Sequence, residues 1–145
     1  MKKIGRLILI LLGVGLVLFL ILQLIPIGKD HTNPPVLSEP DWDSPATRDL
    51  AQRACFDCHS NETVWPWYGN IAPVSWLLWN DVQEGRDNMN FSEWNDGGSQ
   101  DLEEIVEVIQ EGEMPLPQYL LMHPEARLSD ADKQALIDGL TQTLR

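Results

Sequence analysis

The sequence of 145 residues predicts an all-α protein, in which one small helical domain follows an N-terminal transmembrane helix. Residues 7–27 are apolar apart from Gln23, and as a helix they would be roughly 31 Å long, close to the hydrocarbon thickness of a bilayer. Farther along, four apolar side chains repeat at helical spacing: Leu102, Ile105, Val106 and Ile109. No stretch alternates convincingly between apolar and polar residues, as a half-buried strand would.

The apolar run is preceded by three basic residues, Lys2, Lys3 and Arg6, and by no acidic one. It is longer than the core of a cleaved signal peptide, and the sequence LIPIGKD after it has no small-x-small cleavage site. We therefore expect residues 1–27 to form an uncleaved signal anchor. The positive-inside rule keeps the N-terminus in the cytoplasm and places the rest outside. In a bacterium this is a single-pass inner-membrane protein with a periplasmic domain.

Residues 28–44 contain three prolines among many polar residues, which predicts an extended tether. The folded domain is expected over residues 45–145. Its first helix should begin at Pro45, because proline is favoured at the first helical position and Ser44 before it is a good N-cap. Three further helices are expected at residues 72–88, at residues 100–111 before Gly112, and after the N-cap Ser129.

The charge of the chain is unevenly distributed. Residues 28–145 carry 7 basic and 22 acidic residues, whereas the segment before them carries only basic ones. This acidic balance argues against a nucleic-acid partner, whose phosphates would be repelled. It suits partner proteins that present a basic docking surface and are attracted by electrostatic steering, although solubility alone would also explain it.

The only two cysteines, Cys55 and Cys58, are followed directly by His59 in the motif CxxCH. Two thiols at this spacing can add to the two vinyl groups of haem, and the adjacent histidine can then bind the iron as its proximal ligand. The motif therefore predicts one haem c, attached covalently through Cys55 and Cys58, with His59 as metal ligand.

Three other uses of the cysteine pair are weaker. A structural zinc site needs four ligands, and the chain offers only His31 and His123 in addition to His59. A redox dithiol of the thioredoxin type requires a βαβ setting, which the sequence does not predict. A disulfide between Cys55 and Cys58 would close a very small loop and would stabilise the fold little.

Three blocks occur in order after the motif begins: CHSNETVWPWY, then APVSW with DVQEGR and NFSEW, then MPLPQYLLMHPEARLS. Together they resemble the haem-binding-domain family of small c-type cytochromes, over about residues 45–145. The resemblance implies a cytochrome c-like fold, with helices around one covalent haem. It implies a haem cofactor more firmly than it implies a partner or a process.

The iron ligand opposite His59 decides the function, because a filled site favours electron transfer and an open one favours gas or peroxide chemistry. Met114, in the proline-stiffened sequence EGEMPLP, resembles the distal methionine of many c-type cytochromes and is the expected ligand. His123 is the alternative. The WPWY run adds Trp65, Trp67 and Tyr68 as candidate haem contacts, with ordinary core packing as the other interpretation.

We therefore expect a membrane-anchored monohaem cytochrome that transfers single electrons between redox partner proteins on the periplasmic side, and not an enzyme. The first alternative is a haem-based sensor or ligand-binding module with a weak or open sixth position. The second is a peroxidase-like enzyme, which would need a distal acid–base pair that the sequence does not convincingly supply.

Overall fold

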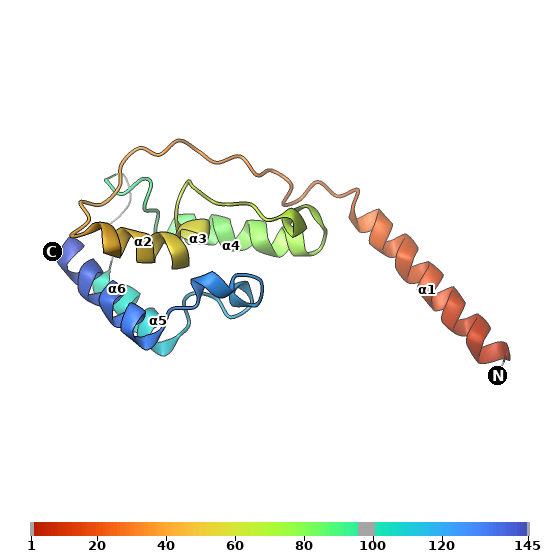
Figure 1. Ribbon diagram of the computed structural model, residues 1–145. Helices are drawn as coiled ribbons and strands as arrows, with labels where there is room; N and C mark the ends of the chain where they lie inside the picture. Colours follow the sequence, from red (N-terminus) through yellow and green to blue (C-terminus); the bar gives the residue numbers. More distant parts are fainter. Residues whose placement is uncertain (1, 96–100, 145) are drawn as a thin grey trace. The chain divides into compact units, whose positions relative to one another are not determined.

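The computed structural model describes residues 2–95 and 101–144, and in these ranges it is helical, without strands (Figure 1). The α-helices are α1 (Lys2–Leu22), α2 (Pro45–Ala54), α3 (Phe56–His59), α4 (Val74–Asn88), α5 (Leu102–Glu111) and α6 (Asp130–Thr143). Three short 3₁₀ helices are η1 (Trp67–Asn70), η2 (Tyr119–Leu121) and η3 (Pro124–Ala126). The all-α prediction is thus confirmed, and the predicted helix start at residue 100 lies outside the described ranges.

The chain forms two compact units, and each contains two separate stretches of sequence. The first unit consists of Met1–Thr32 and Trp65–Asp81, and the second consists of Asn33–Val64 and Val82–Arg145. The boundary at residue 81 falls within α4, so the first half of this helix belongs to one unit and its second half to the other.

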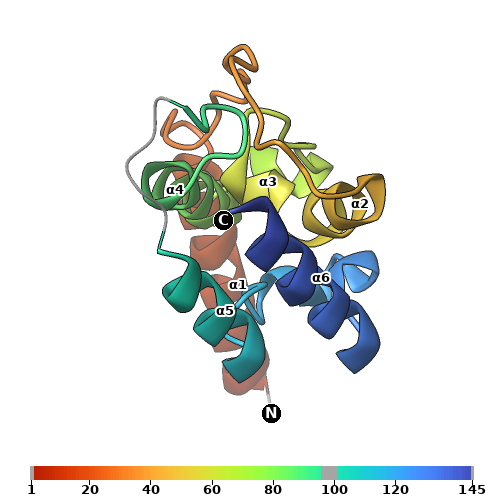
Figure 2. The same ribbon diagram turned by 90° about the vertical axis from the view of Figure 1, so that its left-hand side faces the viewer.

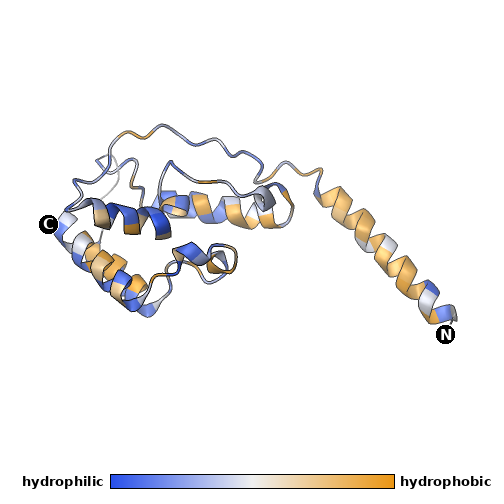
Figure 3. Cartoon of the chain, in the orientation of Figure 1, coloured by the Kyte–Doolittle hydropathy of each residue, from blue (hydrophilic) through white to orange (hydrophobic). Residues whose placement is uncertain are grey.

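The first unit contains α1, which is apolar along nearly its whole length (Figure 3). Over Lys3–Leu22 it is long and apolar enough to cross a membrane, and this rests on length and composition. None of that helix is buried by other parts of the described chain. The unit also contains η1 and the first half of α4, and its residues 65–81 include four of the six tryptophans.

The helix ends that Ser44, Gly112 and Ser129 predict in the sequence are present in the second unit. The side chain of Ser44 accepts a hydrogen bond from the Thr47 amide at the start of α2, at 3.2 Å. Ser129 does the same for the first turn of α6, at 3.1 Å. Gly112 ends α5 with a positive φ of 75°, a left-handed conformation that glycine adopts without steric cost.

The core of the second unit lies between α2, α5 and α6, which pack in the pairs α2 with α6 and α5 with α6 (Figure 2). Its buried members are Ala51, Phe56, Phe91, Ile109, Leu136, Ile137 and Leu140. Helices α2 and α6 approach closely at Gly139, where an added Cβ would lie 2.1 Å from the Thr47 hydroxyl oxygen. Ala51, one turn before Cys55, is also buried in this core, so the packing extends along α2 toward the cysteine motif.

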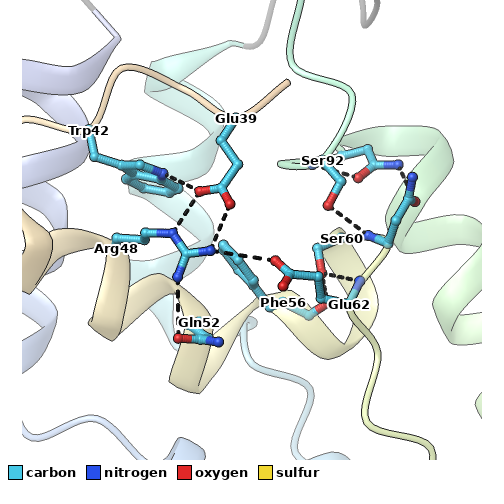
Figure 4. Close-up of polar contacts among 10 residues, drawn as sticks. Glu39, Trp42, Arg48, Gln52, Phe56, Ser60, Glu62 and Ser92 are labelled. Atoms are coloured by element: carbon cyan, nitrogen blue, oxygen red, sulfur yellow. Dashed lines mark hydrogen bonds and ion pairs between the residues drawn. The ribbon is translucent and has the colours of Figure 1, made fainter. Parts of the chain in front are cut away.

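Part of the predicted tether is bound to the second unit by an ion pair. Glu39 accepts two hydrogen bonds from Arg48 of α2, at 2.6 and 2.7 Å, and one from the Trp42 indole at 2.8 Å (Figure 4). These donors lower the pKa of Glu39, with the Arg48 bond as the larger cause. The Trp42 ring lies 5.2 Å from the ring of Phe91, within the aromatic part of the core.

Backbone contacts continue this attachment toward the N-terminus. The amides of Leu37 and Ser38 donate to the Ser92 carbonyl, at 2.8 and 3.1 Å, and Ser38 forms an isolated parallel bridge with Glu93. From Leu37 onward the segment is therefore folded onto the second unit, although its composition predicts an extended tether over residues 28–44.

Candidate functional site

The cysteine motif occupies the junction between α2 and α3. The Cys55 amide donates to the Ala51 carbonyl at 2.8 Å, which completes the last turn of α2. The Cys55 carbonyl then accepts from the amides of Cys58 and His59, at 3.1 and 2.9 Å, and this begins α3. Phe56, between the cysteines, is buried in the core and holds the turn in place. Cys58 consequently follows Cys55 by about one helical turn.

His59 is oriented by a backbone contact from the end of α4. Its Nδ1 lies 3.1 Å from the Met89 carbonyl oxygen. Because a carbonyl can only accept, Nδ1 must carry the hydrogen, and the lone pair is left on Nε2. Burial lowers the pKa of His59, although the bond to Met89 opposes this shift. A buried neutral imidazole with one nitrogen fixed in this way has the form that binds a metal ion.

A cavity of about 300 Å³ opens beside this histidine, within the second unit. Cofactor and small-molecule sites begin at about this size. Its walls are Ala54, Cys55, His59, Asn88, Met89, Phe91, Asp101, Glu104, Ile105, Val108, Ile109, Met114, Pro115 and Leu140. The cavity therefore brings Cys55, His59 and Met114 to one space, although they are far apart in the sequence.

Helix α4 reaches the motif at Gly85. A Cβ added there would lie 2.5 Å from the Cys58 carbonyl oxygen, so only glycine fits without displacing backbone. Through this contact the end of α4 comes close enough for the Met89 carbonyl to reach His59.

The loop that carries Met114 is attached at both of its ends. The Met114 amide donates to the Val108 carbonyl at 3.1 Å, as part of the end of α5. Farther along, the Tyr119 hydroxyl donates to Asp57, inside the CxxCH motif, at 2.6 Å. Burial raises the pKa of Tyr119 above its ordinary value, and the Asp57 carboxylate adds to this shift. The loop is thus bound to the motif that it faces.

The alternative ligand, His123, is not among the cavity-lining residues. Its ring stacks on Tyr119 with 4.1 Å between the ring centres, and its Nδ1 lies 3.0 Å from Glu125. Met114 lines the cavity and His123 does not, and the assignment of Met114 as the ligand opposite His59 stays a prediction. Met89 also lines the cavity and is a second thioether at the site.

Trp65, Trp67 and Tyr68, the predicted haem contacts, belong to the first unit, whereas the cavity walls all belong to the second. Trp65 stacks on His31 with 4.4 Å between ring centres. Trp67 is 72% exposed and meets Tyr68 edge to face. Their assignment to the cofactor stays a prediction.

Four features of the site could not be read from the motif: the Met89 carbonyl, Gly85, Asp101 and Glu104. The first is a backbone atom, and the second is one of ten glycines in the chain. The two carboxylates reach the cavity from the start of α5, a place where acidic residues are also expected as capping groups.

The donor set fits a haem better than a zinc ion. Burial raises the pKa of the Cys55 thiol to about 12, and a tetrahedral zinc site would also need four ligands. Within residues 2–95 and 101–144, no group of three or more His, Cys, Asp and Glu side chains is placed to hold a metal ion. A half-buried thiol, an oriented imidazole and a thioether around a mostly apolar cavity match the side chains that hold haem in proteins.

Comparison with known proteins agrees with this chemistry. The family model described as a haem-binding domain matches residues 17–142, which is most of the chain. No curated protein and no solved structure gave a match. With its cysteine motif, oriented histidine and cavity inside the matched region, the chain belongs to the haem-binding-domain family.

Proposed function

We propose that the protein is a membrane-anchored monohaem c-type cytochrome that transfers single electrons on the periplasmic side of a bacterial inner membrane. The observation that carries this proposal is the cavity that gathers Cys55, His59 and Met114. A haem bound there would supply one-electron exchange between ferric and ferrous iron. The chain then acts as an electron carrier and not as an enzyme.

Each residue of the site has a separate task. The Cys55 and Cys58 thiols would hold the haem by two thioether bonds, one to each of its vinyl groups. His59 offers Nε2 to the iron, because its Nδ1 donates to the Met89 carbonyl. Met114 offers its thioether from the opposite loop. A haem held by both His59 and Met114 would supply electron transfer with little rearrangement of the protein.

The membrane and partner assignments rest on composition. The apolar helix α1 supports a single-pass anchor, and the basic residues before it support a cytoplasmic N-terminus. The second unit contains 20 acidic and 6 basic residues, which suits partners with a basic docking surface. Electron transfer to such a partner should slow as the ionic strength rises, and a rate independent of salt would count against this docking mode.

Attachment of the haem is tested with the full chain, purified with its cofactor. In the wild-type protein the haem should stay with the chain after denaturation. It should be released when both Cys55→Ala and Cys58→Ala are present, and intact mass measures the difference. Haem that leaves the denatured wild-type chain would exclude covalent attachment, while leaving haem binding itself in place.

The axial ligand is tested by absorption spectra of the ferric and ferrous forms. Met114→Ala should abolish the weak ferric near-infrared band of thioether ligation, whereas Met122→Ala, at a methionine that is 57% exposed, should not. The variants Met89→Ala and His123→Ala test the two other candidates. A wild type that is high-spin and binds carbon monoxide readily would instead support the sensor function.

A further inference from the structure

Residues 65–80 differ in composition from the other residues that follow α1. They contain no acidic residue, no basic residue and no histidine, in a chain with 22 acidic residues. Four of the six tryptophans are there, together with one of the two tyrosines. Figure 3 shows the hydrophobic colouring at the beginning of α4, which this segment contains. Tryptophan and tyrosine are enriched at the boundary between lipid and water.

The same segment is bound to the end of α1, inside one compact unit. The Gln23 side chain accepts a hydrogen bond from the Ala72 amide at 2.9 Å and donates to the Ala72 carbonyl at 3.0 Å. It also donates to the Phe19 carbonyl, one turn back in α1, at 3.0 Å. Because α1 would leave the bilayer at about this point, Ala72 and its neighbours are held at the depth of the lipid headgroups.

Two further contacts strengthen this attachment. Gly28, with φ of 71°, approaches the start of α4 so closely that a Cβ would lie 2.2 Å from the Ser75 carbonyl oxygen. His31 stacks on Trp65, and its Nε2 lies 3.2 Å from the Gly28 carbonyl oxygen. The chain after α1 and residues 65–80 are therefore packed together as one element.

Several apolar side chains of this segment are left exposed by the protein. Trp67 is 72% exposed, Leu77 52% and Val74 45%. A bilayer would cover them, because it is the surface that the attached helix already enters. Charge is compatible with the same choice. After α1 the first unit has one basic residue, Lys29, and two acidic ones, Asp30 and Asp81, so it is nearly neutral, whereas the strongly acidic second unit would be repelled by anionic lipid.

We propose that residues 65–80 lie in the headgroup region of the bilayer that α1 crosses, with Trp67, Val74 and Leu77 in contact with lipid. The occupant of this surface is thus the outer leaflet of the protein's own membrane, and not a partner protein. The inference rests on the membrane anchor proposed above. It also gives the exposed tryptophan a function that does not involve the cofactor.

Photocrosslinking tests the contact in the full, haem-loaded chain, in nanodiscs of phosphatidylethanolamine and phosphatidylglycerol. The photoreactive residue p-benzoylphenylalanine replaces Trp67 or Leu77, both exposed, so that the fold tolerates the change. Phe19 of α1 is the site that reports membrane insertion. Leu121, an apolar residue of the second unit that is 74% exposed, is the matched control.

The yield of lipid adducts, measured by intact mass, should be roughly tenfold higher at residues 67 and 77 than at residue 121. A side chain that lies in the headgroup region is in continuous contact with lipid. If labelling at residues 67 and 77 does not exceed labelling at residue 121, while residue 19 is labelled efficiently, residues 65–80 do not lie in the headgroup region. The membrane anchor would then stand without this proposal. No lipid labelling at residue 19 would overturn both the membrane anchor and the headgroup location of residues 65–80. Equal labelling at residue 121 would also overturn the proposal, because contact would then not be specific to residues 65–80.

Discussion

Gly85 is the point at which α4 presses directly on the cysteine motif, so Gly85→Ala should disturb the site from outside its ligands. The new Cβ would lie 2.5 Å from the carbonyl oxygen of Cys58, 2.9 Å from its carbonyl carbon and 3.0 Å from its Cβ. Carbon atoms in contact prefer about 3.5 to 4.0 Å, so the backbones must separate by roughly 1 Å. No side-chain rotation can relieve the two closest contacts, because they involve backbone atoms.

The cost follows from two opposing effects. Overpacking against backbone costs up to about 3 kcal/mol. Alanine recovers about 1 kcal/mol, because glycine is unfavourable inside a helix. We therefore expect the free energy of unfolding to fall by about 2 kcal/mol. For a domain of this size the melting temperature should fall by roughly 10 °C.

Gly139→Ala is the matched control, because it also crowds a contact between helices but lies between α2 and α6, against the Thr47 side chain. Both variants should melt earlier in thermal denaturation. Only Gly85→Ala should also change the absorption spectrum of the haem-loaded protein, since it displaces Cys58 and the His59 that follows. A Gly85→Ala protein with wild-type stability and spectrum would refute the reasoning.

Three further changes test the polar contacts of the second unit. Glu39→Gln should cost about 1 kcal/mol at pH 7 in urea denaturation. The hydrogen bond from Arg48 lowers the pKa of Glu39. The stabilisation is therefore present above the ordinary glutamate pKa of 4.5 and is lost as the pH falls through the lowered pKa. A difference in stability between variant and wild type that persists in stronger acid would contradict this. Tyr119→Phe should lower the free energy of unfolding by about 1.5 kcal/mol, because Asp57 loses a hydrogen-bond donor. It should also speed proteolysis of the loop after α5, and an unchanged cleavage rate would argue against the attachment of this loop to Asp57. Ser129→Ala should lower the helical signal and the melting temperature through a lost cap worth about 1 kcal/mol, whereas equal melting curves would show that the cap contributes nothing.

The helices of the second unit were predictable because their signals are local. Ser44 and Ser129 cap helices by contacts within three residues, and Gly112 ends α5 by its own φ angle. The motif likewise identifies Cys55 and His59 from adjacent letters. Such features depend on backbone geometry over one turn, which a short stretch of sequence determines.

The parts that the sequence did not reveal depend on contacts between distant residues. The Met89 carbonyl orients His59 from 30 positions away, and no residue type marks a carbonyl for this task. Gly85 looks like an unfavourable helix residue until Cys58 is seen beside it. Trp42 looks like part of a tether, yet its ring packs beside Phe91, because burying an aromatic ring outweighs the cost of ordering the chain around it.

The division of the chain into two units has a consequence for how the protein could be released from a membrane. The backbone passes between the units three times, after Thr32, after Val64 and within α4 after Asp81. A single protease cut after Thr32 would sever the only covalent link between α1 and the rest of the chain, but the contacts of Gln23 with Ala72 and of His31 with Trp65 would still join the two fragments. A chain shortened to begin at Asn33 would also lose the contacts that Gln23 and His31 make with Ala72 and Trp65, and would present that apolar surface to water. A soluble form would therefore need replacements within residues 65–80 as well as the loss of α1.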